Sequence, residues 1–178
     1  MKIRSILFCL AVCSLFVACG NKTAKKAAEE QAVEAQAEPV ALPDDFIDFS
    51  VVQPDGTTLS LSDFVGHGKY ILVDFWASWC GPCRQEIPNI KKVYQQFHGD
   101  RFDVLSVAVS DRVDDSLRAI EEEGLEWNQI VGAGQVPAER YGFEFIPYMI
   151  LFAPDGTIVA RDIRGPEIGE AVAKALGK

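Results

Sequence analysis

Short apolar runs alternate with amphipathic stretches from residue 46 onward. Residues 70–76 form a nearly continuous apolar run, which is typical of a strand buried on both faces of a sheet. Residues 104–109 predict the next strand, and residues 113–123 predict a crossover helix that completes a βαβ unit. The alternation therefore predicts an α/β fold in which the strand at 70–76 is central.

Turn and helix-end signals define the remaining elements. Pro-Asp-Gly turns at residues 54–56 and 154–156 each separate two short apolar segments, which predicts one β-hairpin at the start of the domain and one near its end. Apolar side chains recur at helical spacing over residues 87–97, until His98 and Gly99 end that helix. A last helix presents one apolar face, formed by Ile168, Val172 and Leu176.

The first 43 residues differ from this pattern. Basic residues precede an apolar run at 6–18 that is too short for a comfortable membrane span, which predicts a cleaved signal peptide over residues 1–18. Residues 15–20 resemble the lipobox of bacterial lipoproteins, in which Cys19 would carry the lipid. Residues 19–43 lack aromatic residues and predict a flexible tether, followed by one domain at 44–178. We expect a membrane-anchored lipoprotein of the bacterial cell envelope that faces the periplasm.

The charge balance narrows the range of partners. The chain has 26 acidic and 17 basic residues, a net charge of -9, and no long basic run. Nucleic acid is therefore not an expected partner. A chain of 178 residues with 48% hydrophobic content can bury one core, and we expect a single domain that acts as a monomer.

The cysteines point to chemistry rather than to a structural framework. The signal peptide would remove Cys9 and Cys13, and Cys19 would be acylated, so the remaining thiols are Cys80 and Cys83. One close pair cannot join distant segments, and it closes too small a loop to stabilise much. The alternative is half of a zinc site, but zinc needs two more ligands, and no second close cysteine pair exists. We therefore predict a redox pair and no metal site.

The spacing of these cysteines suits reversible disulfide formation. Gly81 and Pro82 separate them at the predicted start of a helix, which brings the two sulfurs within bonding reach. The positive end of the helix dipole would stabilise a thiolate at Cys80, which predicts that this sulfur attacks. Cys83, one turn further along, would then be the buried resolving thiol.

Two separated motifs give the chain a family resemblance. Residues 73–83 resemble the thioredoxin signature, and Ile146-Pro147 before the apolar run at 148–152 resembles the cis-proline loop of thioredoxins. The lipobox, the opening hairpin and the long segment between Asp111 and Arg140 are more similar to the TlpA/ResA-like branch. The resemblance covers residues 44–178. It implies a thioredoxin fold, with a central mixed β-sheet flanked by helices, an N-terminal β-hairpin and a central βα insertion.

The resemblance also implies roles for residues around the cysteines. Cys80 would be the nucleophile, Cys83 the resolving thiol and Pro147 the cis-proline that faces them. The backbone of Ile146 would then form a short strand edge for an incoming peptide. Three further residues complete the expected substrate-binding surface: Trp79, Gly81 and Pro82. Trp79 is the expected apolar rim of the site.

Two acidic residues are candidates for proton transfer. Asp74 interrupts the apolar central strand, where an ionised carboxylate would be costly, so we expect a raised pKa and a proton relay near Cys83. Asp74 also matches the buried acid of thioredoxin. Glu86 lies three residues after Cys83 on the same helical face and resembles an acid of ResA-like proteins. For Glu86, a solvated surface charge and a role in proton transfer or substrate choice both remain open.

These observations predict an envelope thiol-disulfide oxidoreductase that reduces protein disulfides, with cytochrome c maturation among the tasks that the resemblance implies. Its partners would be protein disulfides or dithiols and a membrane electron donor, and no bound cofactor is required. The first alternative is a thiol peroxidase of the peroxiredoxin type, although the Pro-x-x-x-Thr/Ser-x-x-Cys pattern is absent before Cys80. The second is a tethered binding lipoprotein without catalytic activity.

Overall fold

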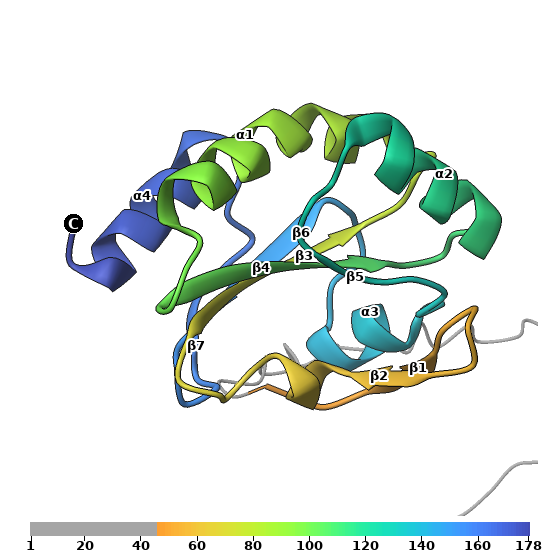
Figure 1. The fold of residues 1–178 in the computed structure, drawn as a ribbon, viewed down its shortest axis with the longest axis horizontal. Helices are drawn as coiled ribbons and strands as arrows, with labels where there is room; N and C mark the ends of the chain where they lie inside the picture. The colour runs from red at the N-terminus through yellow and green to blue at the C-terminus, as the bar shows by residue number, and fades with distance from the viewer. Residues whose placement is uncertain (1–45) are drawn as a thin grey trace, which may run out of the picture. The chain divides into compact units, whose positions relative to one another are not determined.

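A five-stranded mixed sheet forms the centre of the computed structural model, which describes residues 46–178. The strands follow the order β5-β4-β3-β6-β7, so β3 is central as predicted (Figure 1). Strands β3, β4 and β5 are parallel, whereas β6 runs antiparallel to both β3 and β7. Their bounds are β3 Tyr70–Trp76, β4 Phe102–Ala108, β5 Asn128–Ile130, β6 Tyr148–Phe152 and β7 Ile158–Arg161.

Helices and a hairpin cover the two faces of this sheet. Helices α1 (Gly81–Phe97), α2 (Val113–Glu123) and α4 (Pro166–Leu176) lie on one face. On the other face lie α3 (Val136–Tyr141) and the antiparallel hairpin of β1 (Ser50–Val52) and β2 (Thr58–Ser60). A 3-10 helix, Leu61–Asp63, follows the hairpin. Figure 1 shows this three-layer arrangement, which confirms the predicted thioredoxin fold.

The central strand explains how the core is divided. Every residue of β3 after Tyr70 is buried, as expected for a strand covered on both faces. Side chains alternate along a strand, so Leu72 and Trp76 pack against α1 and α4, whereas Val73 and Phe75 pack toward α3 and the hairpin. Asp74 lies between Leu72 and Trp76 in the strand and therefore faces α1.

The predicted central insertion is present as α2 and β5. Helix α2 ends at Gly124, whose positive φ of 57° forms a left-handed cap that most side chains would disfavour. The chain then passes Trp127 and adds β5 to the edge of the sheet, parallel to β4. The insertion thus places the Trp127 side chain in the core under α1.

The predicted domain boundary at residue 44, the signal peptide at 1–18, the tether at 19–43 and the lipidated Cys19 lie outside the described residues. The strand predicted at 104–109 begins two residues earlier, at Phe102. Between residues 46 and 178, no helix combines the length and apolar character needed to cross a membrane.

Candidate active site

Cys80 and Cys83 form a disulfide at the start of α1, with their Cα atoms 5.3 Å apart. Cys80 is the N-cap of the helix, and its Sγ accepts the backbone N–H of Cys83 at 3.2 Å. The exposed fractions are 4% for Cys80 and 3% for Cys83, so the predicted burial of Cys83 is confirmed. Exposure does not distinguish the two cysteines, but the N-cap position does, because amide donors stabilise negative charge at the Cys80 sulfur.

The second predicted motif lies directly beside this disulfide. The Ile146–Pro147 peptide bond is cis, as expected from the resemblance to thioredoxins. The Sγ of Cys80 lies 3.8 Å from the carbonyl oxygen of Ile146. Gly81 and Pro82 are exposed at the start of the helix, whereas Pro147 is buried. The structure therefore brings together the predicted thiols and the predicted peptide-binding backbone.

Asp74 is a buried acid under α1. Its side chain accepts a hydrogen bond from Ser106, whose Oγ donates to Asp74 Oδ2 at 3.1 Å. The pKa of Asp74 is raised to about 7 as the net effect of three causes: desolvation raises it, the Ser106 hydrogen bond lowers it, and the nearby charge of Glu86 raises it. The expected raised pKa is confirmed.

Sequence reasoning missed the hydrogen-bond partner of Asp74, Ser106, and the side chain that bonds Ser106 in turn, Trp127. Ser106 is the neighbour of Asp74 in the register of β3 and β4, and it is fully buried. Trp127 Nε1 donates to Ser106 Oγ at 2.8 Å. Ser106 could have been found by the same pattern that singled out Asp74, because it is also a polar residue within an apolar strand. The contribution of Trp127 had no such signal, because it depends on the path of the insertion.

The Glu86 carboxylate is held by hydrogen bonds. It is partly buried, and its Oε2 accepts hydrogen bonds from Asn89 Nδ2 and from the backbone N–H of Gly165, both at 2.9 Å. Gly165 is the N-cap of α4. These bonds show a partly buried, hydrogen-bonded carboxylate rather than a fully solvated one, and a role of Glu86 in proton transfer or substrate choice stays a prediction. The carboxylate joins α1 to the start of α4 and adds negative potential near Asp74.

A third acid, Asp111, holds the loop that leads to the cysteines. Asp111 Oδ2 accepts the backbone N–H of Ser78 at 2.7 Å, and Oδ1 accepts the Ser78 hydroxyl at 3.0 Å. Next to it, Trp79 Nε1 donates to the carbonyl oxygen of Ser110 at 3.0 Å. Trp79 is 64% exposed, as expected for a rim residue. These contacts join segments far apart along the chain, and no local pattern around Asp111 or Trp79 indicates them.

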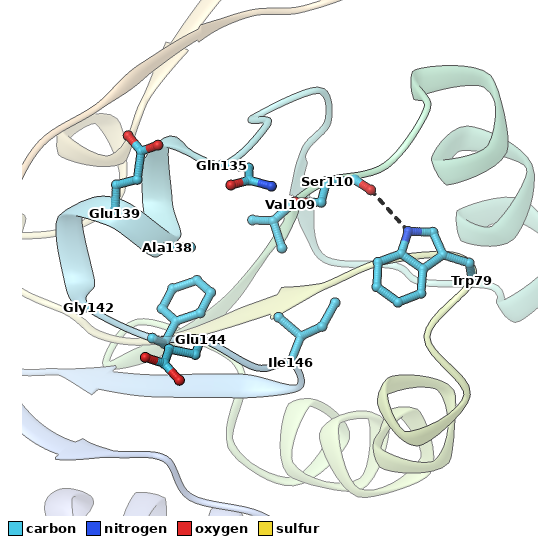
Figure 2. A pocket seen from close by; sticks show the side chains of 10 residues that line it. Trp79, Val109, Ser110, Gln135, Ala138, Glu139, Gly142, Glu144 and Ile146 are labelled. Carbon is cyan, nitrogen blue, oxygen red and sulfur yellow. Dashed lines mark hydrogen bonds between the residues drawn. The ribbon is translucent and has the colours of Figure 1, made fainter. Parts of the chain in front are cut away.

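A hollow of about 420 Å³ opens beside Trp79 and Ile146. Figure 2 shows Trp79 on one side and Gln135 and Glu139 of the α3 region on the other, with the bond from Trp79 to Ser110 dashed. The wall combines apolar and acidic residues: Val109, Ala138, Phe143, Glu139 and Glu144. Two of its lining residues, Trp79 and Ile146, are also neighbours of Cys80.

Potential metal ligands do not gather at this site. Within the described part of the chain, no group of three or more His, Cys, Asp and Glu side chains is arranged to hold an ion. The site combines two sulfur atoms at a helix start with a buried acid, Asp74, beneath the helix.

A thioredoxin fold with two bonded cysteines at the start of α1 defines a thiol-disulfide oxidoreductase. The AhpC/TSA family model matches residues 42–161, and the chain belongs to this family.

Three relatives illustrate the similarity. The thiol:disulfide interchange protein CycY of Rhizobium leguminosarum bv. viciae is 32% identical over 131 residues, which cover 68% of each chain. The thiol-disulfide oxidoreductase ResA of Bacillus subtilis is 24% identical over 128 residues, covering 72% of this chain and 70% of ResA. The crystal structure of the thioredoxin domain of a Bacteroides vulgatus thiol-disulfide oxidoreductase has 35% identity and a TM-score of 0.68, with 76% of this chain and 97% of that chain covered.

Proposed function

We propose that this protein reduces disulfide bonds of other proteins in the bacterial cell envelope through Cys80 and Cys83. The observation that carries the proposal is the position of the Cys80 sulfur. It accepts the Cys83 amide at the helix start and lies 3.8 Å from the Ile146 carbonyl oxygen, where a substrate backbone can approach. A sulfur at that position is both activated as a thiolate and adjacent to the substrate.

The reaction begins with the reduced protein. The Cys80 thiolate attacks one sulfur of the substrate disulfide, so that the substrate S–S bond breaks, a mixed disulfide forms and the other substrate sulfur leaves as a thiolate. Cys83 then loses its proton and attacks the Cys80 sulfur. The substrate is released with both sulfurs reduced, and the protein holds the Cys80–Cys83 disulfide. Two electrons have passed to the substrate, and a membrane electron donor must return two to the protein.

Asp74 is the proposed acceptor of the Cys83 proton. Its strand neighbours Leu72 and Trp76 pack in the same core cluster as Cys83, so the Asp74 carboxylate lies on the face of the sheet beneath the dithiol. Because its pKa is raised to about 7, it can both take and return a proton near neutral pH. In this proposal Glu86 acts indirectly. Its negative charge raises the pKa of Asp74, and its carboxylate accepts the backbone N–H of Gly165 at the start of α4.

The substrate segment would lie across the surface formed by Trp79, Gly81, Pro82 and the Ile146–Pro147 loop. The exposed Trp79 ring supplies apolar contact area, and the Ile146 backbone supplies hydrogen bonds. The adjacent hollow has room for a side chain that flanks the substrate cysteine. The two glutamates on its wall would disfavour an acidic flanking residue.

The cellular setting is part of the same proposal. Cleavage of the signal peptide and acylation of Cys19 would tether the domain to the membrane. Cytochrome c maturation is among the tasks we propose, since it requires reduced cysteines outside the cytoplasm. Mass spectrometry of the mature N-terminus tests the anchor directly: a lipid on Cys19 is expected, and an unmodified Cys19 would contradict it.

Insulin reduction in the presence of dithiothreitol tests the activity. The wild-type protein should accelerate precipitation of the insulin chains, and the double variant Cys80→Ser, Cys83→Ser should not. Wild-type behaviour of that variant refutes the proposal. Hydrogen peroxide consumption through a Cys80 sulfenic acid would instead support the peroxidase alternative. A reduction potential too low for cellular reductants to open the disulfide would support the binding lipoprotein.

A further inference from the structure

A continuous line of buried polar groups leads from the insertion to Asp74. Trp127 Nε1 donates to Ser106 Oγ at 2.8 Å, and Ser106 Oγ donates to Asp74 Oδ2 at 3.1 Å. The exposed fractions of Trp127, Ser106 and Asp74 are 5%, 0% and 4%. Burying a polar group costs free energy unless it is hydrogen-bonded, and hydrogen bonds in a chain polarise one another. Loss of the bond between Trp127 and Ser106 should therefore also weaken the bond between Ser106 and Asp74.

The donor capacities of these groups fix the direction of the line. An indole N–H can only donate, so Trp127 must use a lone pair of the Ser106 oxygen. The single hydroxyl proton of Ser106 then points to Asp74 Oδ2. Asp74 Oδ1 has no hydrogen-bond partner among the described residues. The hydroxyl is thus the one hydrogen-bond donor of the described chain that meets this carboxylate, and it favours the ionised form.

We propose that Trp127 and Ser106 are positioning residues that hold a hydroxyl proton against Asp74 and thereby set how readily Asp74 accepts the proton of Cys83. The proposal rests on the proposed function of Asp74. It assigns a purpose to the insertion of α2 and β5, because this segment delivers the indole that orients Ser106.

The other groups around Asp74 act in the opposite direction or not at all. From α1, Glu86 faces Asp74 with a like charge and disfavours ionisation. From β6, the register neighbour of Asp74 is Met149, which does not titrate. From β4, the neighbour is Ser106 itself. Removal of the Ser106 hydroxyl therefore leaves desolvation and Glu86 unopposed.

The expected result is an upward shift of the Asp74 pKa. In Ser106→Ala we expect a rise of about one unit, the usual worth of a buried hydrogen bond to a charged group. In Trp127→Phe we expect a smaller rise in the same direction, because the hydroxyl remains but loses the donor that orients and polarises it. Ser106→Thr retains the hydroxyl and should return the pKa toward the wild-type value.

Carbon-detected NMR titration of the Asp74 carboxyl, in the oxidised protein, measures this shift directly. Ser116→Ala is the matched control, since Ser116 is also a fully buried serine but bonds Asp111 and the Arg112 carbonyl instead. It should leave the Asp74 titration unchanged. Unfolding in urea establishes that each variant is folded before it is titrated.

The inference and the proposed function fail in different ways. An unchanged Asp74 titration in both Ser106→Ala and Trp127→Phe overturns the inference, whatever the activity. The pH profile of insulin reduction supplies the second readout, and its midpoint should move up together with the Asp74 pKa. If the titration moves while the rate profile does not, Asp74 is not the proton acceptor, and the proposed function of this residue fails.

Discussion

The dithiol and the acid beneath it are built in different ways. The dithiol is contained in four consecutive residues at a helix start, and its main hydrogen bond joins Cys80 to the amide of Cys83. Asp74 instead depends on Ser106 from the neighbouring strand and on Trp127 from the insertion. The sulfur chemistry is therefore set locally, whereas the proton chemistry is set by tertiary contacts. Variants can separate the two.

The largest effect is expected from the sulfurs themselves. Cys80→Ser removes the attacking group, so insulin reduction should fall to the rate of dithiothreitol alone. Cys83→Ser retains the attack but cannot resolve the product, so it should accumulate a mixed disulfide with substrate. Non-reducing electrophoresis separates these outcomes. If Cys80→Ser accumulated the mixed disulfide instead, the roles of the two cysteines would have to be exchanged.

The next largest effect concerns Asp74 and the way the free energy of unfolding depends on pH. Because its pKa is raised from 3.8 to about 7, the folded state keeps a proton that the unfolded chain releases above about pH 4. Stability from this residue is complete below pH 4, declines as the pH rises and is lost above pH 7. The oxidised wild type should therefore lose about 4 kcal/mol more than Asp74→Asn between pH 4 and pH 8.

Urea unfolding at both pH values measures this difference, and the oxidised form keeps the cysteines from titrating. An asparagine at position 74 also carries a buried polar group, but its cost does not change with pH. The informative quantity is therefore the difference between the two proteins in how the free energy of unfolding changes with pH. Parallel pH dependence in the two proteins would show that Asp74 titrates normally, and the distinction between the two regions would be lost.

A third prediction concerns the loop between Asp74 on β3 and Cys80 at the start of α1. Asp111→Ala leaves the amide and the hydroxyl of Ser78 without their acceptor. Loss of such bonds should lower the free energy of unfolding by about 2–3 kcal/mol. Insulin reduction should fall, since Trp79 follows this loop, while alkylation of reduced Cys80 by iodoacetamide should continue at the wild-type rate. Ser78→Ala removes one of the bonds and should have a smaller effect.

Sequence reasoning succeeded where the signal is local. The run at 70–76, the helix after the cysteines and the proline at 147 each carry their pattern within a few residues, and the structure has the strand, the helix and the cis bond. The buried state of Asp74 was predictable because its strand neighbours are apolar. Its partner Ser106 and the Trp127 indole that bonds Ser106 were not predictable, because strand register and the path of the insertion decide which side chains meet.

Glu86 and Asp111 illustrate the same limit. Helical spacing placed Glu86 near Cys83 along the helix, but its hydrogen bond from Gly165 depends on where α4 begins, which the spacing does not show. Asp111 was noted as the start of a long segment, and nothing in its neighbours indicated that it would accept two bonds from Ser78. Polar contacts between distant segments are therefore the part of this site that could not be predicted from the sequence alone.

The smallest expected effect concerns substrate choice at the hollow, which lies outside both regions of the comparison. Glu139 and Glu144 are exposed on its wall. The double variant Glu139→Gln, Glu144→Gln should therefore increase the rate on a disulfide peptide with acidic flanking residues by about 3-fold relative to one with basic flanking residues, because exposed charge pairs contribute less than about 1 kcal/mol each. The preference should shrink at high salt, which screens exposed charges.

A charge-matched control makes this result specific to the hollow. Glu121→Gln, Glu170→Gln also removes two negative charges, but from exposed positions on α2 and α4, on the opposite face of the sheet from α3. If both double variants change the peptide preference equally, the effect comes from the net charge of the protein and not from the hollow. If only the first does, while Cys80 alkylation and the Asp74 titration stay unchanged, substrate choice is separable from both the sulfur and the proton chemistry.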